Sequence, residues 1–308
     1  MSDNASLYLQ ERLNSIQHRF SGQLSFAAHN LATGESIQFD DSRIYPTASV
    51  FKMPVMVEVY RQYEAGLLDL SQRVTLQSGD IVKGSGILRD IRAGAELTLA
   101  DLVMLMIIVS DNTATNMLID LVGGIERINA TIDALGMSDT RINSRIDFDF
   151  IGDDGRRLAV SSPRDLARLM QLLARGEVVS QQSSDAMLGI LGRQHYLNQF
   201  PRYVQYNSYG PELGEPQDVW IGCKTGALPG LRADAGLITL PGDLSIAFAV
   251  MNEGSADTGF GFENESEVVN GLIGWSLIQY WWPKDIAGDP PLIGSPYFDQ
   301  FGLSHHES

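Results

Sequence analysis

Residues 46–52 read Pro46-Thr-Ala-Ser49-Val-Phe-Lys52 and lead into an apolar segment, Val50 to Ala65, that stops at Gly66. The spacing predicts a helix that begins near Ser49. Positions three residues apart share one face of a helix, so Lys52 can reach over the Ser49 hydroxyl. A serine hydroxyl becomes a good nucleophile when a neighbouring base takes its proton, and a helix N-terminus favours the oxyanion that forms. Ser49 is therefore our candidate nucleophile, and Lys52 is its candidate base.

Lysine is rare in this chain, which gives Lys52 more weight than a chance Ser-x-x-Lys match would have. There are only four lysines among the 22 basic residues, namely Lys52, Lys83, Lys224 and Lys284. Lysine can lose its proton inside a protein, whereas arginine effectively cannot. The alternative is a surface lysine on a helix.

Two further motifs follow along the chain. Ser110-Asp111-Asn112 comes directly after the apolar run Leu102 to Val109, where it could either carry chemistry or simply cap the next helix. Lys224-Thr225-Gly226 ends a predicted strand. There Lys224 offers charge for a carboxylate, Thr225 offers a hydroxyl, and Gly226 lets a ligand approach the strand closely. The alternative for this motif is an ordinary strand end.

The arrangement of predicted strands and helices defines the fold class. A hairpin, Gln23 to Asn30 with Glu35 to Phe39, lies near the start, and three strands lie near the end, at Asp218 to Lys224, Arg232 to Leu240 and Leu244 to Asn252. Helical patterns fill the middle and also occupy both ends, at Leu7 to Phe20 and Glu265 to Tyr280. We expect an α/β (α+β) fold in which the five strands form one antiparallel sheet flanked by the terminal helices.

The same pattern predicts two domains, with the active site between them. Residues 1–45 plus 205–308 would form a discontinuous sheet domain, and residues 46–204 would form an all-α insert. From Pro283 onward Pro, Gly and Ser dominate, and we expect a loosely held tail.

Composition excludes several classes of function. The 308 residues carry a net charge of −16, which argues against binding to nucleic acid or to anionic membranes. Cys223 is the only cysteine, so neither an intrachain disulfide nor a thiolate zinc site can form. The histidines do not form an H-E-x-x-H motif; they are His18, His29, His195, His305 and His306. We expect no metal, nucleotide or flavin cofactor, and we expect a monomer.

The first residues, Met-Ser-Asp-Asn-Ala-Ser, have neither a basic nor an apolar region typical of a signal peptide. The longest apolar run, Leu102 to Val109, is too short to span a bilayer. The chain as given reads as cytoplasmic, unless an export signal has been removed from it.

The three motifs together carry a family resemblance. Ser-x-x-Lys, Ser-Asp-Asn and Lys-Thr-Gly occur here in this order, and the trio is the signature of class A β-lactamases and penicillin-binding proteins. The chain resembles that superfamily over nearly all its length. Thr98-Leu-Ala-Asp-Leu102 and Gly84-Ser-Gly86 are smaller similarities to it. The resemblance implies a small-molecule substrate, a β-lactam or a related acyl compound.

The resemblance also implies a role for each motif residue. Ser49 would form the acyl-enzyme, Lys52 would take its proton, and Ser110 would pass a proton to the leaving nitrogen. Asn112 would hold the side-chain amide of the substrate, while Lys224 and Thr225 would bind its carboxylate beside Gly226. The backbone N–H groups of Ser49 and Ala227 would form the oxyanion hole. Arg232 would add positive charge near the carboxylate, or else be an ordinary exposed strand arginine.

One feature of the family is missing. A glutamate that activates the deacylating water is expected about 17 residues before Pro163, and that position is Ile146. Asp147 and Asp149 are the nearest carboxylates, and Phe150 stands where an asparagine is expected. We therefore predict ready acylation, with fast deacylation only if Asp147 or another group orders the water.

Several functions fit these observations. The main prediction is a class A-like β-lactamase. The alternatives are a D,D-peptidase or esterase of the same superfamily, and a penicillin-binding or sensing module without turnover. A Ser-His-Asp hydrolase is disfavoured because the chain has no G-x-S-x-G and offers only His29 and His195 as bases within the fold.

Overall fold

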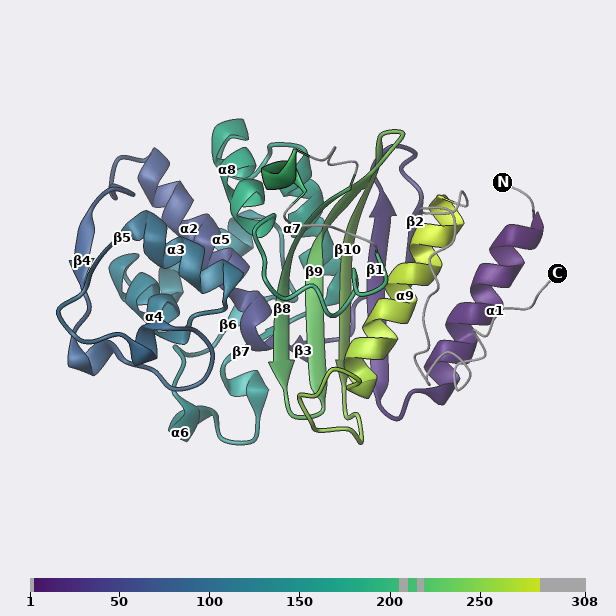
Figure 1. Ribbon diagram of the computed structural model, residues 1–308, viewed down its shortest axis with the longest axis horizontal. Helices are drawn as coiled ribbons and strands as arrows, with labels where there is room; N and C mark the ends of the chain where they lie inside the picture. The colour runs from purple at the N-terminus through teal and green to yellow at the C-terminus, as the bar shows by residue number, and fades with distance from the viewer. Residues whose placement is uncertain (1–2, 205–209, 215–218, 283–308) are drawn as a thin grey trace.

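A computed structural model describes residues 3–204, 210–214 and 219–282. Five strands form one antiparallel sheet in the order β2-β1-β10-β9-β8 (Figure 1). Their bounds are β1 Gln23–Asn30, β2 Ser36–Phe39, β8 Trp220–Leu228, β9 Leu231–Leu240 and β10 Leu244–Glu253. The predicted α/β fold class and the five-stranded antiparallel sheet are confirmed.

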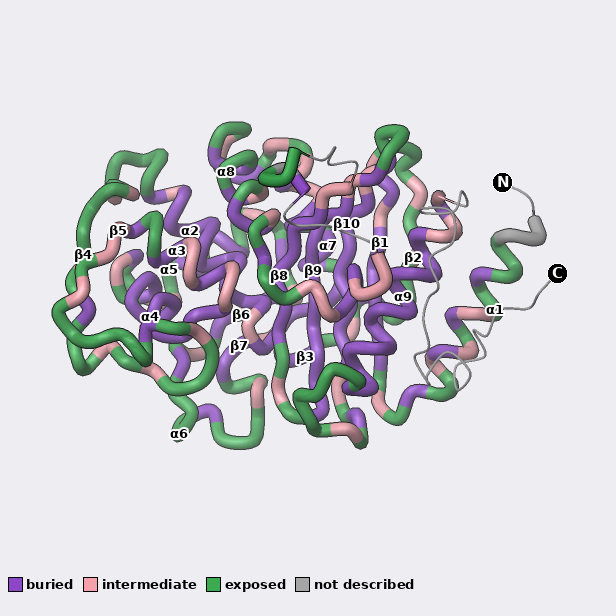
Figure 2. Tube along the Cα trace, viewed as in Figure 1, coloured by how far each residue is buried: buried purple, intermediate pink, exposed green. Residues whose placement is uncertain are grey.

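The central strands are apolar on both faces, as expected for a sheet that is covered on both sides. In β9 the residues Ala233, Ala235 and Leu237 face one hydrophobic cluster, and Ile238 faces another. From Ala235 to Ile238 the sequence is apolar without interruption, because neither face of the strand contacts water there. Figure 2 shows most of the trace along β9 and β10 as buried.

Two helices from opposite ends of the chain cover one face of the sheet. Helix α1 (Asp3–Arg19) and helix α9 (Glu265–Trp281) pack against each other, and Figure 1 shows them side by side beyond the sheet. Ile16 from α1 and Leu272 from α9 are fully buried in the same cluster as Phe26 and Phe248 of the sheet. The predicted flanking of the sheet by the terminal helices is confirmed.

The helical part of the molecule is built around α2 (Lys52–Glu64). Its first nine residues are all buried, as in a helix surrounded on all sides by other elements. Around it lie α3 (Leu99–Ile108), α4 (Asn112–Leu121), α5 (Ile125–Ala134) and α8 (Gln181–Leu191). Helix α7 (Pro163–Ala174) instead packs against β1, β9 and β10, on the sheet face opposite α9. The division at residues 46 and 205 remains a prediction.

Several short elements were not predicted from the sequence. They include the small sheet β3 (Tyr45–Pro46), β7 (Ala159–Ser161) and β6 (Arg141–Ile142), the pair β4 (Arg73–Thr75) and β5 (Glu96–Thr98), helix α6 (Phe148–Ile151) and helix α8. Strand β8 continues four residues past Lys224, so the expectation that Lys-Thr-Gly ends a strand is wrong. The predicted tail from residue 283 onward, with His305 and His306, lies outside the described residues. Within the described part, no helix is both long and apolar enough to cross a membrane.

Candidate active site

Ser49 lies in a short 3-10 helix, η1 (Ala48–Phe51), which continues directly into α2. Strand β8 runs beside η1 at Gly226. A Cβ atom on Gly226 would lie 2.5 Å from the Thr47 carbonyl oxygen and 3.0 Å from Ser49 N, so only glycine allows this approach. Gly226 thus serves a contact within the protein, and it brings the backbone of Ala227 next to the start of the Ser49 helix.

Lys52 is completely buried, and its ammonium nitrogen points into the 110–112 turn. The Nζ atom donates to Ser110 O at 2.7 Å, to Asn112 Oδ1 at 2.8 Å and to Ser110 Oγ at 3.1 Å. Burial lowers the Lys52 pKa well below its ordinary value, and the positive charge of Lys224 lowers it further. A lowered pKa makes it easier for this amine to lose a proton, and the neutral amine that results has a lone pair that can accept one.

Ser110 connects the two lysines of the site. Its hydroxyl lies 3.1 Å from Lys52 Nζ and 3.2 Å from Lys224 Nζ. Lys224 is also fully buried, and burial lowers its pKa to about 8. A hydroxyl held between two amines of lowered pKa can pass a proton from one side to the other.

The Ser110-Asp111-Asn112 turn is both a helix cap and part of the site. Asp111 caps α4 by accepting from Ala114 N at 2.9 Å, and it also accepts from Leu88 N at 2.8 Å. These bonds hold Ser110 in a left-handed conformation with φ 55°, a strained geometry that proteins retain mainly at functional sites. The alternative of a helix cap is confirmed for Asp111. The chemical role of Ser110 and Asn112 stays a prediction.

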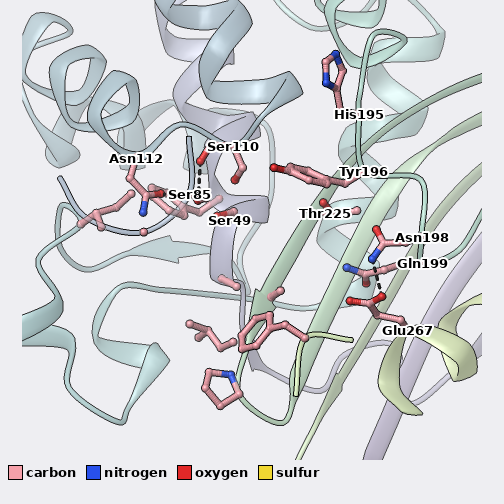
Figure 3. Close-up of a pocket in the computed structure, with 18 of the residues that line it drawn as sticks. Ser49, Ser85, Ser110, Asn112, His195, Tyr196, Asn198, Gln199, Thr225 and Glu267 are labelled. Atoms are coloured by element: carbon pink, nitrogen blue, oxygen red, sulfur yellow. Dashed lines mark hydrogen bonds between the residues drawn. The ribbon is translucent and has the colours of Figure 1, made fainter. Parts of the chain in front are cut away.

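Ser85 completes the polar cluster around Lys52. Its hydroxyl donates to Ser110 O at 2.8 Å and to Asn112 Oδ1 at 3.2 Å, while Asn112 Nδ2 donates to Lys83 O at 2.9 Å. Figure 3 shows Ser85, Ser110 and Asn112 gathered on the same side of Ser49. The sequence did not assign a role to Ser85, although Gly84-Ser85-Gly86 was visible as a small motif.

These groups open into a cavity of about 710 Å³ between the helical part and the sheet. Ser49, Ser110, Asn112 and Thr225 line it together, as does Ala227. The structure thus brings residues from the three distant motifs into one site. Among the residues that the structure describes, no group of three or more His, Cys, Asp or Glu side chains is placed to hold a metal.

Comparison with known proteins decides the family. A family model described as the β-lactamase enzyme family matches residues 8–281. The chain belongs to the β-lactamase enzyme family. It is a serine β-lactamase-like hydrolase.

Individual relatives agree with this assignment. The crystal structure of a β-lactamase from Sphaerobacter thermophilus DSM 20745 is 32% identical, with a TM-score of 0.78, and the match covers 88% of this chain and 96% of that one. A β-lactamase from Rhodobacter capsulatus is 26% identical over 57% of this chain and 59% of its own length. An acyl-enzyme complex of a PBP-A mutant with penicillin G is 26% identical, with a TM-score of 0.73, and covers 89% and 97% of the two chains.

The far wall of the cavity in this β-lactamase family member comes from residues 194–200, which no motif predicted. Gln194 Nε2 donates to the carbonyls of Ile107 at 3.0 Å and Cys223 at 3.1 Å, joining helix α3 to strand β8. Phe200 N donates to Asp234 Oδ2 at 3.1 Å, and burial raises the pKa of Asp234 to about 7. These bonds fix the segment that places His195, Tyr196, Asn198 and Gln199 along the cavity (Figure 3).

Ile146 is the position where the family resemblance led us to expect a glutamate. Its backbone is held in both directions by Asn116, which donates to Ile146 O at 2.8 Å and accepts from Ile146 N at 2.9 Å. The side chain is 5% exposed and lines the cavity. The position is therefore fixed beside the site, but it carries a hydrocarbon instead of a carboxylate.

Asp147 is not among the residues that line the cavity. It is exposed, and its Oδ1 accepts from the backbone N–H groups of Asp149 at 3.0 Å and Phe150 at 3.2 Å, which makes it the cap of α6. Asp149 and Phe150 are exposed on the same short helix. The structure does not bring the Asp147 carboxylate together with Ser49 and Lys52, and its catalytic role remains a prediction without geometric support.

Arg232 is completely buried, so the alternative of an exposed strand arginine is wrong. Its Nε donates to Glu267 Oε1 at 2.9 Å, and its other nitrogens donate to the carbonyls of Leu228, Leu231 and Gly259. It does not line the cavity, whereas Glu267 does. The Arg232 charge, which was predicted to face a substrate carboxylate, is instead paired with Glu267, and this pair ties the start of β9 to helix α9.

Removing Glu267 is expected to destabilise the protein, because it leaves the Arg232 charge buried without its partner. We expect Glu267→Ala to lower the free energy of unfolding by about 3 kcal/mol, as measured by urea denaturation. Glu263→Ala is the matched control. Its ion pair with Arg202 is 53% exposed on the glutamate side, and its loss should cost less than about 1 kcal/mol. Equal effects of the two substitutions would contradict a structural role for the Arg232–Glu267 pair.

Proposed function

We propose that this hydrolase opens the amide bond of β-lactams through an acyl-enzyme on Ser49. The observation that carries the proposal is the buried Lys52, whose Nζ lies 3.1 Å from Ser110 Oγ. Burial lowers the Lys52 pKa well below its ordinary value, so the amine can act as a base. The penicillin G adduct of the PBP-A mutant supports the same substrate class.

The proposed acylation uses the Ser49 hydroxyl and the hydrogen-bonded cluster of Lys52, Ser110 and Lys224. Ser49 Oγ forms a bond to the lactam carbonyl carbon while its proton moves to Lys52 Nζ. The N–H groups of Ser49 and Ala227 stabilise the oxyanion. The carbon–nitrogen bond then breaks, and the leaving nitrogen receives the Ser110 proton, which Lys52 replaces across 3.1 Å. Asn112 holds the acyl amide, and Lys224 with Thr225 binds the carboxylate.

The simplest test is the colour change of nitrocefin on ring opening. The parent protein is expected to open the ring, and Ser49→Ala is expected to reduce the rate to that of the buffer. Ser85→Ala retains the nucleophile and serves as a comparison within the same polar cluster. If Ser49→Ala matched the parent protein, the proposed function would be wrong.

The rate of acylation is expected to depend on pH in two opposite ways. It rises with pH as Lys52 loses its proton. It falls again as pH passes about 8, because Lys224 then loses the positive charge that binds the substrate carboxylate. Lys224→Arg keeps a charge at all these pH values, so the decline near pH 8 should disappear. A decline near pH 8 that is unchanged in Lys224→Arg would contradict this assignment.

The second candidate is a D,D-peptidase or esterase of the same superfamily, and Ile146 favours it. Release of a penicilloyl group requires an activated water, and the expected carboxylate is absent from position 146. A D-Ala-D-Ala peptide and a simple thioester with the same acyl group separate the candidates. If the protein turns over the peptide or the thioester while its penicillin adduct persists, it is a peptidase or an esterase. If it turns over penicillin faster than the peptide and the thioester, it is a β-lactamase.

A further inference from the structure

Six of the apolar residues that line the Ser49 cavity form a group that we call the apolar rim: Phe148, Leu158, Leu228, Pro229, Phe260 and Phe262. Its three phenylalanines are 45%, 65% and 92% exposed, in that order along the chain. Exposed apolar side chains that gather at one cavity are typical of binding sites on soluble proteins. The rim lines the same cavity as the nucleophile, so its natural occupant is part of the substrate.

The rim flanks the two groups that would hold the acyl part of the substrate. A Cβ atom on Gly84 would lie 2.6 Å from Asn112 Nδ2 and 3.1 Å from Phe148 Cζ, so these two side chains meet over the same residue. On the other side, the Phe260 ring covers the Arg232 guanidinium at 4.7 Å, and Arg232 is the strand partner of Ala227. A substrate that reaches from Ala227 to Asn112 therefore extends its acyl side chain toward the rim.

The cavity offers the acyl side chain no charge to pair with, since the buried Lys224 is assigned to the substrate carboxylate. Among the described residues that line the cavity, Glu267 is the one acidic residue, and there is no lysine or arginine. Both Glu267 oxygens are engaged, by Arg232 Nε at 2.9 Å and by Asn198 Nδ2 at 2.6 Å. Ile146 extends the apolar wall inward from the rim. A charged side chain would lose its hydration here without compensation.

We propose that the apolar rim is an acyl-binding subsite that selects substrates with a bulky, uncharged hydrocarbon side chain, aromatic or medium-length aliphatic. This inference rests on the proposed acyl-enzyme function, since it assumes that the acyl group sits between Ala227 and Asn112. The subsite supplies binding energy at a distance from the reacting bond. We therefore expect it to raise the second-order rate constant of acylation for substrates that fill it.

The test uses penicillins that differ only in their acyl side chain: acetyl, butanoyl, hexanoyl and octanoyl. The second-order rate of adduct formation on Ser49 is measured by intact mass. It should rise by about fourfold for each methylene group that becomes buried. Phe262→Ala should reduce this dependence on chain length and should leave folding intact, because the ring is 92% exposed. Phe148→Ala should reduce it as well.

Phe150→Ala is the matched control for Phe148→Ala. Phe150 lies on the same short helix and is 54% exposed, but it does not line the cavity. In the Phe150→Ala variant, the rate of adduct formation should depend on acyl chain length as strongly as in the parent protein. Adduct formation at equal rates for all four penicillins would overturn the apolar subsite while leaving the acyl-enzyme function intact. The apolar subsite would also be overturned if Phe150→Ala and Phe262→Ala reduced the dependence on chain length equally. If no member of the series formed an adduct and all four penicillins were left intact, the proposed function itself would be overturned.

Discussion

Replacing Lys52 with methionine is expected to slow acylation of Ser49 by about 10²–10⁴-fold, the usual contribution of a general base. Methionine fills the buried space without an amine. The turn retains a donor, because Ser85 Oγ already donates to Ser110 O at 2.8 Å and to Asn112 Oδ1 at 3.2 Å. The loss should therefore appear in the rate of adduct formation while the fold, measured by circular dichroism, stays the same.

Lys83→Met is the control for this substitution. Lys83 is exposed, and it contacts the site through its backbone carbonyl, which accepts from Asn112 Nδ2 at 2.9 Å. Replacing its side chain should leave the acylation rate within about twofold of the parent, as expected for a surface change. If Lys52→Met acylated as fast as Lys83→Met, another group would have to be the base.

Ile146→Glu is expected to accelerate release of the acyl group by about 10²–10⁴-fold, because it adds a general base for the deacylating water. Asn116 fixes the Ile146 backbone through two hydrogen bonds of 2.8 and 2.9 Å, so a new side chain at this position should line the same cavity. Burial raises the pKa of a carboxyl group. The gain should consequently increase with pH as the new glutamate loses its proton.

Two further variants test which carboxylate, if any, acts as the base for deacylation. Ile146→Gln has nearly the same shape without the charge, and it should leave the deacylation rate unchanged. Asp147→Ala should lower stability by about 1 kcal/mol through the lost helix cap, and the geometry gives no reason for deacylation to change. An increase in Ile146→Gln equal to that in Ile146→Glu would contradict the role of a general base. Slower deacylation in Asp147→Ala would restore Asp147 as the group that orders the water.

The sequence was informative where chemistry depends on residue type and local spacing. Ser49 and Lys52 lie on consecutive helical segments, and Asp111 caps a helix within its own motif, so short-range patterns sufficed. The missing glutamate could also be located by spacing, at Ile146. The fold followed from apolar strands at both ends of the chain and helices between them.

Features that depend on tertiary pairing could not be predicted in this way. The pattern placed Arg232 on a strand, but nothing local indicates that Glu267 of α9 would reach it at 2.9 Å. The wall at residues 194–200 depends on distant carbonyls such as Ile107 O. Phe260 and Phe262 lie in the loop between β10 and α9, where no periodicity shows which way a side chain faces.

The most direct test of the account is the intact mass of the protein over time after mixing with benzylpenicillin. We predict a rapid gain of one penicillin, located on Ser49 by peptide mapping, that decays slowly in the parent and quickly in Ile146→Glu. The gain should be absent in Ser49→Ala. An unchanged mass with the penicillin left intact, or an adduct that persists in Ser49→Ala, would contradict the account.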